Sequence, residues 1–302
     1  MPTVLSPECP ERFCLYKDLL YRETLATPYR GKGEPQKQLV VPSKYREKII
    51  NQAHSALFGA HMGITRTKRR VAQNFFWPDM VKKITYYCRT CGVFQRQGTV
   101  QDRTKAKLCP LPIISTPFQR LEINLVGPLP KATRRGNKYI LTVMDFATRY
   151  PEAIPLCKME TDTVADALIN YMSRLGFASE IVSDLGTSFT SRLIKRIWKA
   201  CGITQINSTP YHPGTNGLIE KFNGMLVCMI KAYVAEKPKD LDSKIQPLLY
   251  AYKSIPQEST GFSPFELLLG REVCGPLDLL RMNWEDHNES DPESVIEYMN
   301  RL

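Results

Sequence analysis

The stretch Ile181-Val-Ser-Asp-Leu-Gly-Thr-Ser-Phe189 ends a short apolar run with a carboxylate, Asp184. A second stretch, His212-Pro-Gly-Thr-Asn-Gly-Leu-Ile-Glu-Lys-Phe-Asn223, has turn residues followed by a helical pattern, with Glu220 about one turn inside the helix. Two carboxylates, one closing a strand and the other near the start of a helix, can converge on a divalent metal for phosphodiester chemistry. The pair predicts a magnesium or manganese site at Asp184 and Glu220.

Two further stretches lie upstream and have the alternating pattern of strands. They are Phe118-Gln-Arg-Leu-Glu-Ile-Asn-Leu-Val-Gly-Pro-Leu-Pro130 and Tyr139-Ile-Leu-Thr-Val-Met-Asp-Phe-Ala-Thr-Arg-Tyr150. Downstream, apolar periodicity and punctuation predict strands at 181–183 and 204–208. The same signals predict helices at 161–175, 193–201, 217–235, 241–254 and 263–269.

In this order and spacing, the four quoted stretches resemble integrases of gypsy-class LTR retrotransposons, relatives of retroviral integrases. The resemblance runs from about residue 41 to about residue 275. It implies an α/β fold with an RNase H-like core, a mixed five-stranded sheet flanked by helices, over residues 116–275. It also implies a triad of acids that holds two Mg²⁺ or Mn²⁺ ions and transfers DNA strands.

The first position of the implied triad departs from the family, because it is Asn124. By resemblance, Asp184 bridges the two ions and Glu220 holds one of them, while Asn124 offers only a neutral carbonyl. Metal ions contribute several kcal/mol of transition-state stabilisation, so losing one ligand charge predicts weaker metal binding and slower catalysis.

Asp145 is a candidate to compensate for Asn124. A hairpin turning at residues 134 and 135 sets residues 124 and 145 opposite each other, and paired residues point to the same face. The interpretation that we favour is structural, with Asp145 capping a turn or pairing with Arg149.

A metal motif precedes the core. His54 and His61 are followed by Cys88-Arg-Thr-Cys91, and thiolates with imidazoles suit tetrahedral Zn²⁺. Four protein ligands leave no open position, so the predicted zinc is structural. Residues 41–97 also resemble the family's helical HHCC zinc-binding module, with Trp77 expected in its core.

Charge favours a nucleic-acid partner. The chain has a net charge of +11, and from Arg66 to Lys107 there are eleven Lys or Arg against two acids. The candidate DNA-binding residues are Lys68, Arg69, Arg70, Lys221 and Asn223. Such contacts to phosphate predict binding with little sequence specificity.

The remaining segments are predicted from composition. We expect an N-terminal extension at 1–40 with a small hairpin, a basic linker at 98–115 and an acidic tail at 276–302. No apolar stretch approaches the roughly 20 residues of a membrane helix, and the scattered cysteines suit reduced thiols in an intracellular protein. By resemblance, the recombining complex is a homo-oligomer, and the tail stands where the family usually has a further DNA-contacting module.

Three functions fit the sequence. One is an active DNA integrase, and the second is an integrase-derived protein with weakened catalysis that still binds zinc and DNA. The third is a non-catalytic protein-interaction module. We favour the second, with nuclear residence inferred from the DNA substrate. A truncated element, a polyprotein fragment and a host-adopted gene all fit this pattern.

Overall fold

The computed structural model describes residues 11–24, 36–96, 116–184, 186–207, 217–234 and 240–285. The chain forms two compact units: Met1–Gly98 with Tyr250–Leu302, and Thr99–Leu249. The predicted linker at 98–115 and residues 286–302 of the predicted tail lie outside the described residues.

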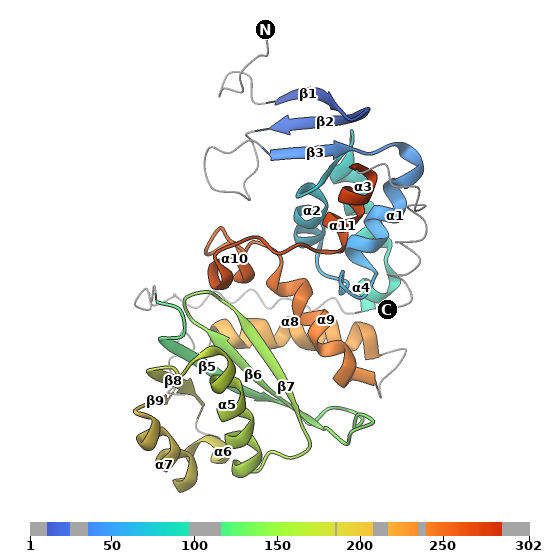
Figure 1. Ribbon diagram of the computed structural model, residues 1–302. Coiled ribbons are helices and arrows are strands. Elements are labelled where there is room, and N and C mark those ends of the chain that lie inside the picture. Colours follow the sequence, from blue (N-terminus) through green and yellow to red (C-terminus); the bar gives the residue numbers. More distant parts are fainter. Residues whose placement is uncertain are drawn as a thin grey trace. The chain divides into compact units, whose positions relative to one another are not determined.

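The second unit is built on a five-stranded mixed sheet (Figure 1). Its strands are β5 (Arg120–Val126), β6 (Tyr139–Asp145), β7 (Pro151–Leu156), β8 (Glu180–Ser183) and β9 (Thr204–Asn207). In the order β7-β6-β5-β8-β9, the first three strands pair antiparallel, whereas β5, β8 and β9 pair parallel. The predicted mixed sheet is confirmed, and β5 is its central strand.

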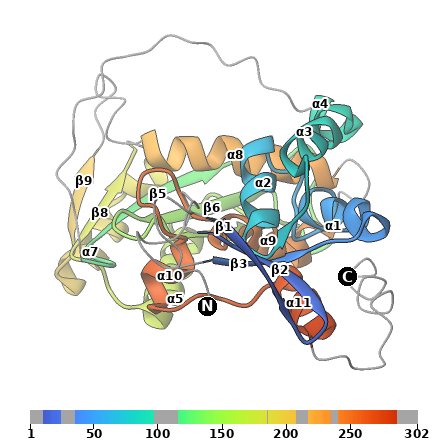
Figure 2. The ribbon, with the colours of Figure 1, turned by 90° about the horizontal axis from the view of Figure 1, so that it is seen from above.

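Helices cover both faces of this sheet. On one face, α5 (Thr161–Leu175), α6 (Thr187–Thr190) and α7 (Arg192–Cys201) share an apolar core with Leu121 and Ile123 of β5. On the other face, α8 (Gly217–Val234) contacts β5 and β6 (Figure 2). Side chains alternate along a strand, so Glu122 and Asn124 face α8. We call this side of the sheet the α8 face.

The first unit combines a four-stranded sheet, in the order β1-β2-β3-β4, with short helices. Its strands are β1 (Glu11–Tyr16), β2 (Leu19–Thr24), β3 (Gln36–Val40) and β4 (Phe75–Phe76). Its helices are α1 (Ser43–His54), α2 (Ile64–Ala72), α3 (Met80–Thr90), α4 (Gly92–Arg96), α10 (Pro264–Leu269) and α11 (Pro276–Glu285), and α9 (Leu241–Lys253) begins in the second unit and ends in this one. Trp77 is fully buried in the core, as predicted.

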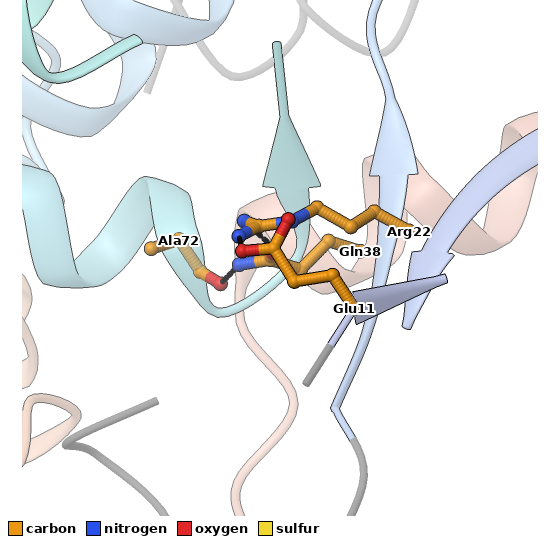
Figure 3. A network of polar contacts seen from close by, with 4 residues as sticks. All are labelled: Glu11, Arg22, Gln38 and Ala72. Atoms are coloured by element: carbon orange, nitrogen blue, oxygen red, sulfur yellow. Dashed lines mark hydrogen bonds and ion pairs between the residues drawn. The ribbon is translucent and has the colours of Figure 1, made fainter. Parts of the chain in front are cut away.

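The predicted N-terminal hairpin is part of the same sheet as the zinc-binding segment. β1 and β2 pair antiparallel, and β3 pairs in parallel with β4. Figure 3 shows Arg22 at the centre of a polar network, donating to Glu11 and, at 3.1 Å, to Oε1 of Gln38. Gln38 in turn donates to the carbonyl of Ala72 in α2. The network joins residues of the predicted extension to the helical module.

The C-terminal part of the chain differs from the predicted boundaries. The unit that contains the five-stranded sheet ends at Leu249, whereas the core was expected to reach residue 275. The start of the expected acidic tail is the helix α11, and its Leu277 and Leu280 are buried in the core of the first unit. Asp278 of this helix accepts a bond from Asn74 at 2.7 Å. This part of the expected tail is therefore a helix that packs through Leu277 and Leu280, while Leu279 and Met282 are exposed.

Within the described ranges, every helix is too short or too polar to cross a membrane.

Candidate functional site

The register of the sheet brings two of the predicted catalytic positions to neighbouring places. The parallel register pairs Leu121 with Ile181 and Glu122 with Val182. Continued along both chains, it sets Asn124 beside Asp184, which follows β8 directly. Neighbouring residues in register point to the same face, so both belong to the α8 face.

The third position, Glu220, lies in the first turn of α8 and is exposed. Asp184 is half-buried, and its Oδ1 accepts a bond of 2.9 Å from the amide of Gly186. A Cβ at residue 186 would lie only 2.9 Å from that oxygen, so glycine leaves room for the carboxylate in this position. Asn124, Asp184 and Glu220 therefore come from three elements that meet at one face.

The donor atoms of this face suit a hard cation, because they are carboxylate and amide oxygens. Among the described residues, the acids of the α8 face do not form a group of three within 4.8 Å of one another. A two-metal site holds its ions about 3.5–4 Å apart, so its acids are spread over a wider space than around one ion.

Asp145 does not compensate for Asn124. The observed register pairs Asn124 with Thr142 and Asp145 with Leu121, so the predicted pairing of residues 124 and 145 is wrong. Asp145 therefore belongs to the face opposite Asn124. Its carboxylate accepts bonds from the amides of Phe118 and Thr148 at 3.0 and 2.9 Å. This confirms the favoured interpretation of Asp145 as a turn cap.

Glu122 is an acid of the α8 face that the sequence interpretation missed. It is fully buried, and its Oε2 accepts a bond of 3.3 Å from the amide of Ile219, next to Glu220. The pKa of Glu122 is raised to about 8, mainly by burial and also by the charge of Glu220, against the lowering effects of the Ile219 amide and Arg149. The sequence does contain a sign of this role. Glu122 is two residues from Asn124 on a predicted strand, so both side chains lie on the same face of the sheet.

Three of the four predicted zinc ligands form a close group in the first unit, and the fourth, Cys88, lies against His54. His54 ends α1, His61 follows in a turn, and Cys88 and Cys91 lie in and just after α3. Ligand atoms of His54, His61 and Cys91 lie within 4.8 Å of one another. The Cys88 Sγ lies 3.5 Å from Nδ1 of His54, and the Cys91 Sγ lies 3.4 Å from Nδ1 of His61.

These separations fit zinc. Bonds of about 2.3 Å to sulfur and 2.05 Å to nitrogen at a tetrahedral angle separate the two ligands by about 3.6 Å. His54 is fully buried. Burial lowers the pKa of His54 to about 4, which keeps the imidazole neutral as a metal ligand requires.

The turn between the two histidines is shaped by Gly59. A Cβ there would lie 2.7 Å from backbone atoms of His54, so only glycine permits this approach. The amide of His61 then donates to the carbonyl of His54 at 2.8 Å. The turn brings the second imidazole back beside the first.

The two sites correspond to two known domains. A model of the integrase zinc binding domain matches residues 41–99, and a model of the integrase core domain matches residues 115–213. Together the matches cover more than half of the 302 residues. The chain belongs to the integrase family.

Relatives of this integrase occur among retroelement proteins. The chain is 31% identical over 233 residues to the retrovirus-related Pol polyprotein from transposon 412 of Drosophila melanogaster, covering 76% of this chain and 18% of that protein. It is 26% identical over 252 residues to the human gypsy retrotransposon integrase-like protein 1, covering 82% of this chain and 47% of that protein. It thus spans less than half the length of each relative.

Among solved structures, a chain of the simian T-cell lymphotropic virus intasome, in complex with a PP2A regulatory subunit, is 15% identical with a TM-score of 0.49. That match covers 65% of this integrase and 69% of the viral chain.

The predicted DNA-binding residues belong to both units. Lys221 is exposed on α8 beside Glu220, and Asn223 is half-buried on the same helix. Lys68 of α2 is half-buried. Arg69 donates to the carbonyl of Pro256 at 3.0 Å and pairs with Glu258 at 3.4 Å.

Arg70 corrects the prediction of a phosphate-binding role. Its side chain is buried, and its guanidinium donates to the carbonyls of Ala53 at 3.0 Å and Ala251 at 2.7 Å. Burial lowers the pKa of Arg70 to about 10, so it remains charged near neutral pH. Its partners lie far away in the sequence, and the basic cluster Lys68-Arg-Arg70 gave no sign of them.

Arg70→Ala is expected to destabilise the first unit of the integrase by about 2 kcal/mol or more, because two buried carbonyls lose their donors. Urea denaturation measures the change in the free energy of unfolding. Lys68→Ala is the control on the same helix, with an expected change within about 0.5 kcal/mol. Equal stability of the two variants would contradict the structural role of Arg70.

Glu122→Gln is expected to stabilise the metal-free integrase increasingly as pH rises. The folded chain keeps the Glu122 proton up to a pKa of about 8, whereas the ordinary value is 4.5. The stability due to that proton is complete below the ordinary value and is lost as pH rises through the folded pKa. The variant should gain up to about 1.4 kcal/mol per pH unit in this window. Urea denaturation at several pH values measures the gap, and parallel pH profiles would contradict the expectation.

Proposed function

We propose that this chain is an integrase-type DNA-binding protein whose strand-transfer site is weakened by Asn124. The observation that supports the proposal is the meeting of Asn124, Asp184 and Glu220 on the α8 face. Two of these three residues carry the charge that divalent metals need, and the third has a neutral amide.

Each residue of the proposed metal site has a separate role. Mg²⁺ or Mn²⁺ bound at the α8 face would activate an attacking hydroxyl and stabilise the leaving oxygen. Asp184, with one oxygen already held by the Gly186 amide, has its other oxygen available as a ligand. Glu220, exposed at the start of α8, would hold the metal from the helix side. Asn124 orients a carbonyl oxygen but adds no charge, so metal binding and the rate of strand transfer are both reduced.

Zinc has a separate, structural part in the proposal. His54, His61, Cys88 and Cys91 would fill all four positions around the ion, leaving none for a substrate. The ion would hold the ends of α1 and α3 together and so maintain the basic surface of the first unit.

DNA binding rests on exposed basic residues near the proposed metal site. Lys221 follows Glu220 on α8, so a phosphate approaching the metals comes within reach of its ammonium. Asn223 lies one turn further along the helix, with its Oδ1 buried and unpaired in the described part of the chain. The proposal includes binding with little sequence preference, assembly into oligomers on DNA, and residence in the nucleus where that DNA lies.

Lys221→Ala is expected to weaken binding to all DNA sequences alike and to lower the salt slope by about one counterion. Fluorescence anisotropy with labelled duplexes, from low to physiological salt, measures both quantities. Lys231→Ala changes an exposed lysine ten residues along the same helix and is the matched control. No DNA binding by the unaltered chain at low salt would instead favour a protein-interaction module.

A further inference from the structure

We propose that Glu122 is a third carboxylate ligand of the divalent-metal site on the α8 face, partly replacing the acid that Asn124 lacks. The inference rests on the proposed function, because it assigns a residue to the metal site proposed there. It concerns an acid at a position where the family resemblance implied none.

The backbone brings Glu122 to the site. Glu122 and Asn124 are two residues apart on the central strand, which separates their Cα atoms by about 6.6 Å on the same face. A glutamate side chain is one methylene longer than an aspartate, so it covers part of that distance. The bond from the Ile219 amide to Oε2 shows that the carboxylate reaches the first turn of α8. Glu220 belongs to the same turn.

The second carboxylate oxygen is the observation that points to a ligand. Oε1 of Glu122 is buried and has no hydrogen-bond partner among the residues that the structure describes. Buried carboxylate oxygens are rarely left in this state, because the lost hydration is not replaced. A cation that takes oxygen ligands replaces it directly.

The surrounding charge fits the same ligand. Glu220 lies near enough to Glu122 for its charge to disfavour the charge of Glu122, whereas the charge of Arg149 acts in the opposite direction. A divalent cation between the two acids converts this repulsion into attraction. Neighbouring Asp184 completes three negative charges, the number that an intact triad has.

A purely structural role predicts a different behaviour. If Glu122 only caps the first turn of α8 through the Ile219 amide, its replacement changes stability but leaves metal affinity unaltered. Metal affinity and metal-free stability therefore separate the two roles, and neither requires catalytic activity.

The test measures Mn²⁺ binding to the full zinc-loaded chain by titration calorimetry and by the electron paramagnetic resonance signal of free Mn²⁺. Glu122→Gln is expected to weaken binding by about tenfold to 100-fold while remaining folded by circular dichroism. The control is Glu152→Gln, which changes another buried carboxylate. Glu152 lies in β7 and accepts a bond of 2.6 Å from Gln246, and its variant should bind Mn²⁺ as the unaltered chain does.

The same measurement in an Asn124→Asp chain makes the test more specific. With an aspartate restored by Asn124→Asp, the third charge no longer depends on Glu122, so the further change Glu122→Gln should cost much less Mn²⁺ affinity. Equal losses in both backgrounds would overturn the inference.

The outcomes also distinguish the inference from the proposed function. Undiminished Mn²⁺ binding in Glu122→Gln, with binding lost in Glu220→Gln, would overturn the role of Glu122 and leave the proposed metal site intact. No Mn²⁺ binding by the unaltered chain would overturn both.

Discussion

Asn124→Asp is expected to join labelled DNA ends to a target DNA at least about a hundredfold faster than the unaltered chain. Residue 124 is half-buried on the α8 face, and the β5–β8 register continued by two residues sets it beside Asp184. A carboxylate there restores a ligand charge in a site where metal ions supply several kcal/mol of stabilisation. Each 1.4 kcal/mol or so is worth about tenfold in rate, so a partial recovery reaches two orders of magnitude. A strand-transfer assay with Mg²⁺ and then Mn²⁺ measures the gain.

Two further variants make the result specific. Glu220→Gln should abolish strand transfer in both the unaltered chain and the Asn124→Asp chain, because it removes an acid of the same site. Asp166→Asn changes an exposed acid of α5, which packs on the other face of the sheet, and should leave the rates unchanged. An unaltered chain as fast as Asn124→Asp would show that Asn124 is tolerated, and silence in both chains would exclude strand transfer.

The elements that sequence could predict are those determined by local pattern. Alternation along Arg120–Val126 predicts a strand, and the ladder of apolar residues in Thr161–Leu175 predicts a helix with the bounds observed. The zinc ligands are equally local, since the chemistry of thiolate and imidazole restricts which metal they suit. Hence the fold and the candidate metal-binding positions could be predicted from the sequence alone.

The pairing of β5 with β6 could not be read in this way. A two-residue hairpin fixes its register through its turn type, but these strands are joined by the long loop Gly127–Lys138. The turn residues alone set Asn124 opposite Asp145, whereas the observed partner is Thr142. Shifting the register by an odd number of residues moves a side chain to the other face, which removed Asp145 from the site.

Distant contacts account for the other differences. Arg70 reads as a surface cation because its acceptor at Ala251 comes from a segment far along the chain. The acidic composition after Pro276 hides Leu277 and Leu280, which are apolar because they pack in the first unit. Glu122 was overlooked because a polar residue within a strand is ordinarily assigned to solvent, and here α8 buries it.

Removal of zinc is expected to unfold the first unit while the second unit remains folded. Structural zinc contributes about 10–16 kcal/mol in small zinc-binding peptides, which is comparable to the usual 5–15 kcal/mol stability of a domain. The core of the first unit adjoins the ligands, since Cys88 is itself fully buried beside Trp77, Ile84 and Val71. Without the ion, the ends of α1 and α3 lose their link and the thiolates repel each other.

Tryptophan emission can report the unfolding of each unit separately. Trp77 and Trp284 pack in the core of the first unit, whereas Trp198 is buried in the second. In a Trp198→Phe chain, a strong chelator should therefore shift the emission to the red as Trp77 loses its fully buried environment. Cys91→Ser should show the shifted emission without chelator, and Cys201→Ser, which changes an exposed thiol of the second unit, should behave like the parent chain.

The same prediction states that the second unit stays folded when zinc is removed. A chain that keeps only Trp198, with phenylalanine at positions 77 and 284, should show little change on chelation, because the α5–α7 core around Trp198 contains no zinc ligand. Elemental analysis of the purified chain should give one zinc per chain. A chain without stoichiometric zinc, or one whose Trp77 emission is unchanged by the chelator, would show that the His54, His61, Cys88 and Cys91 cluster does not hold this unit together.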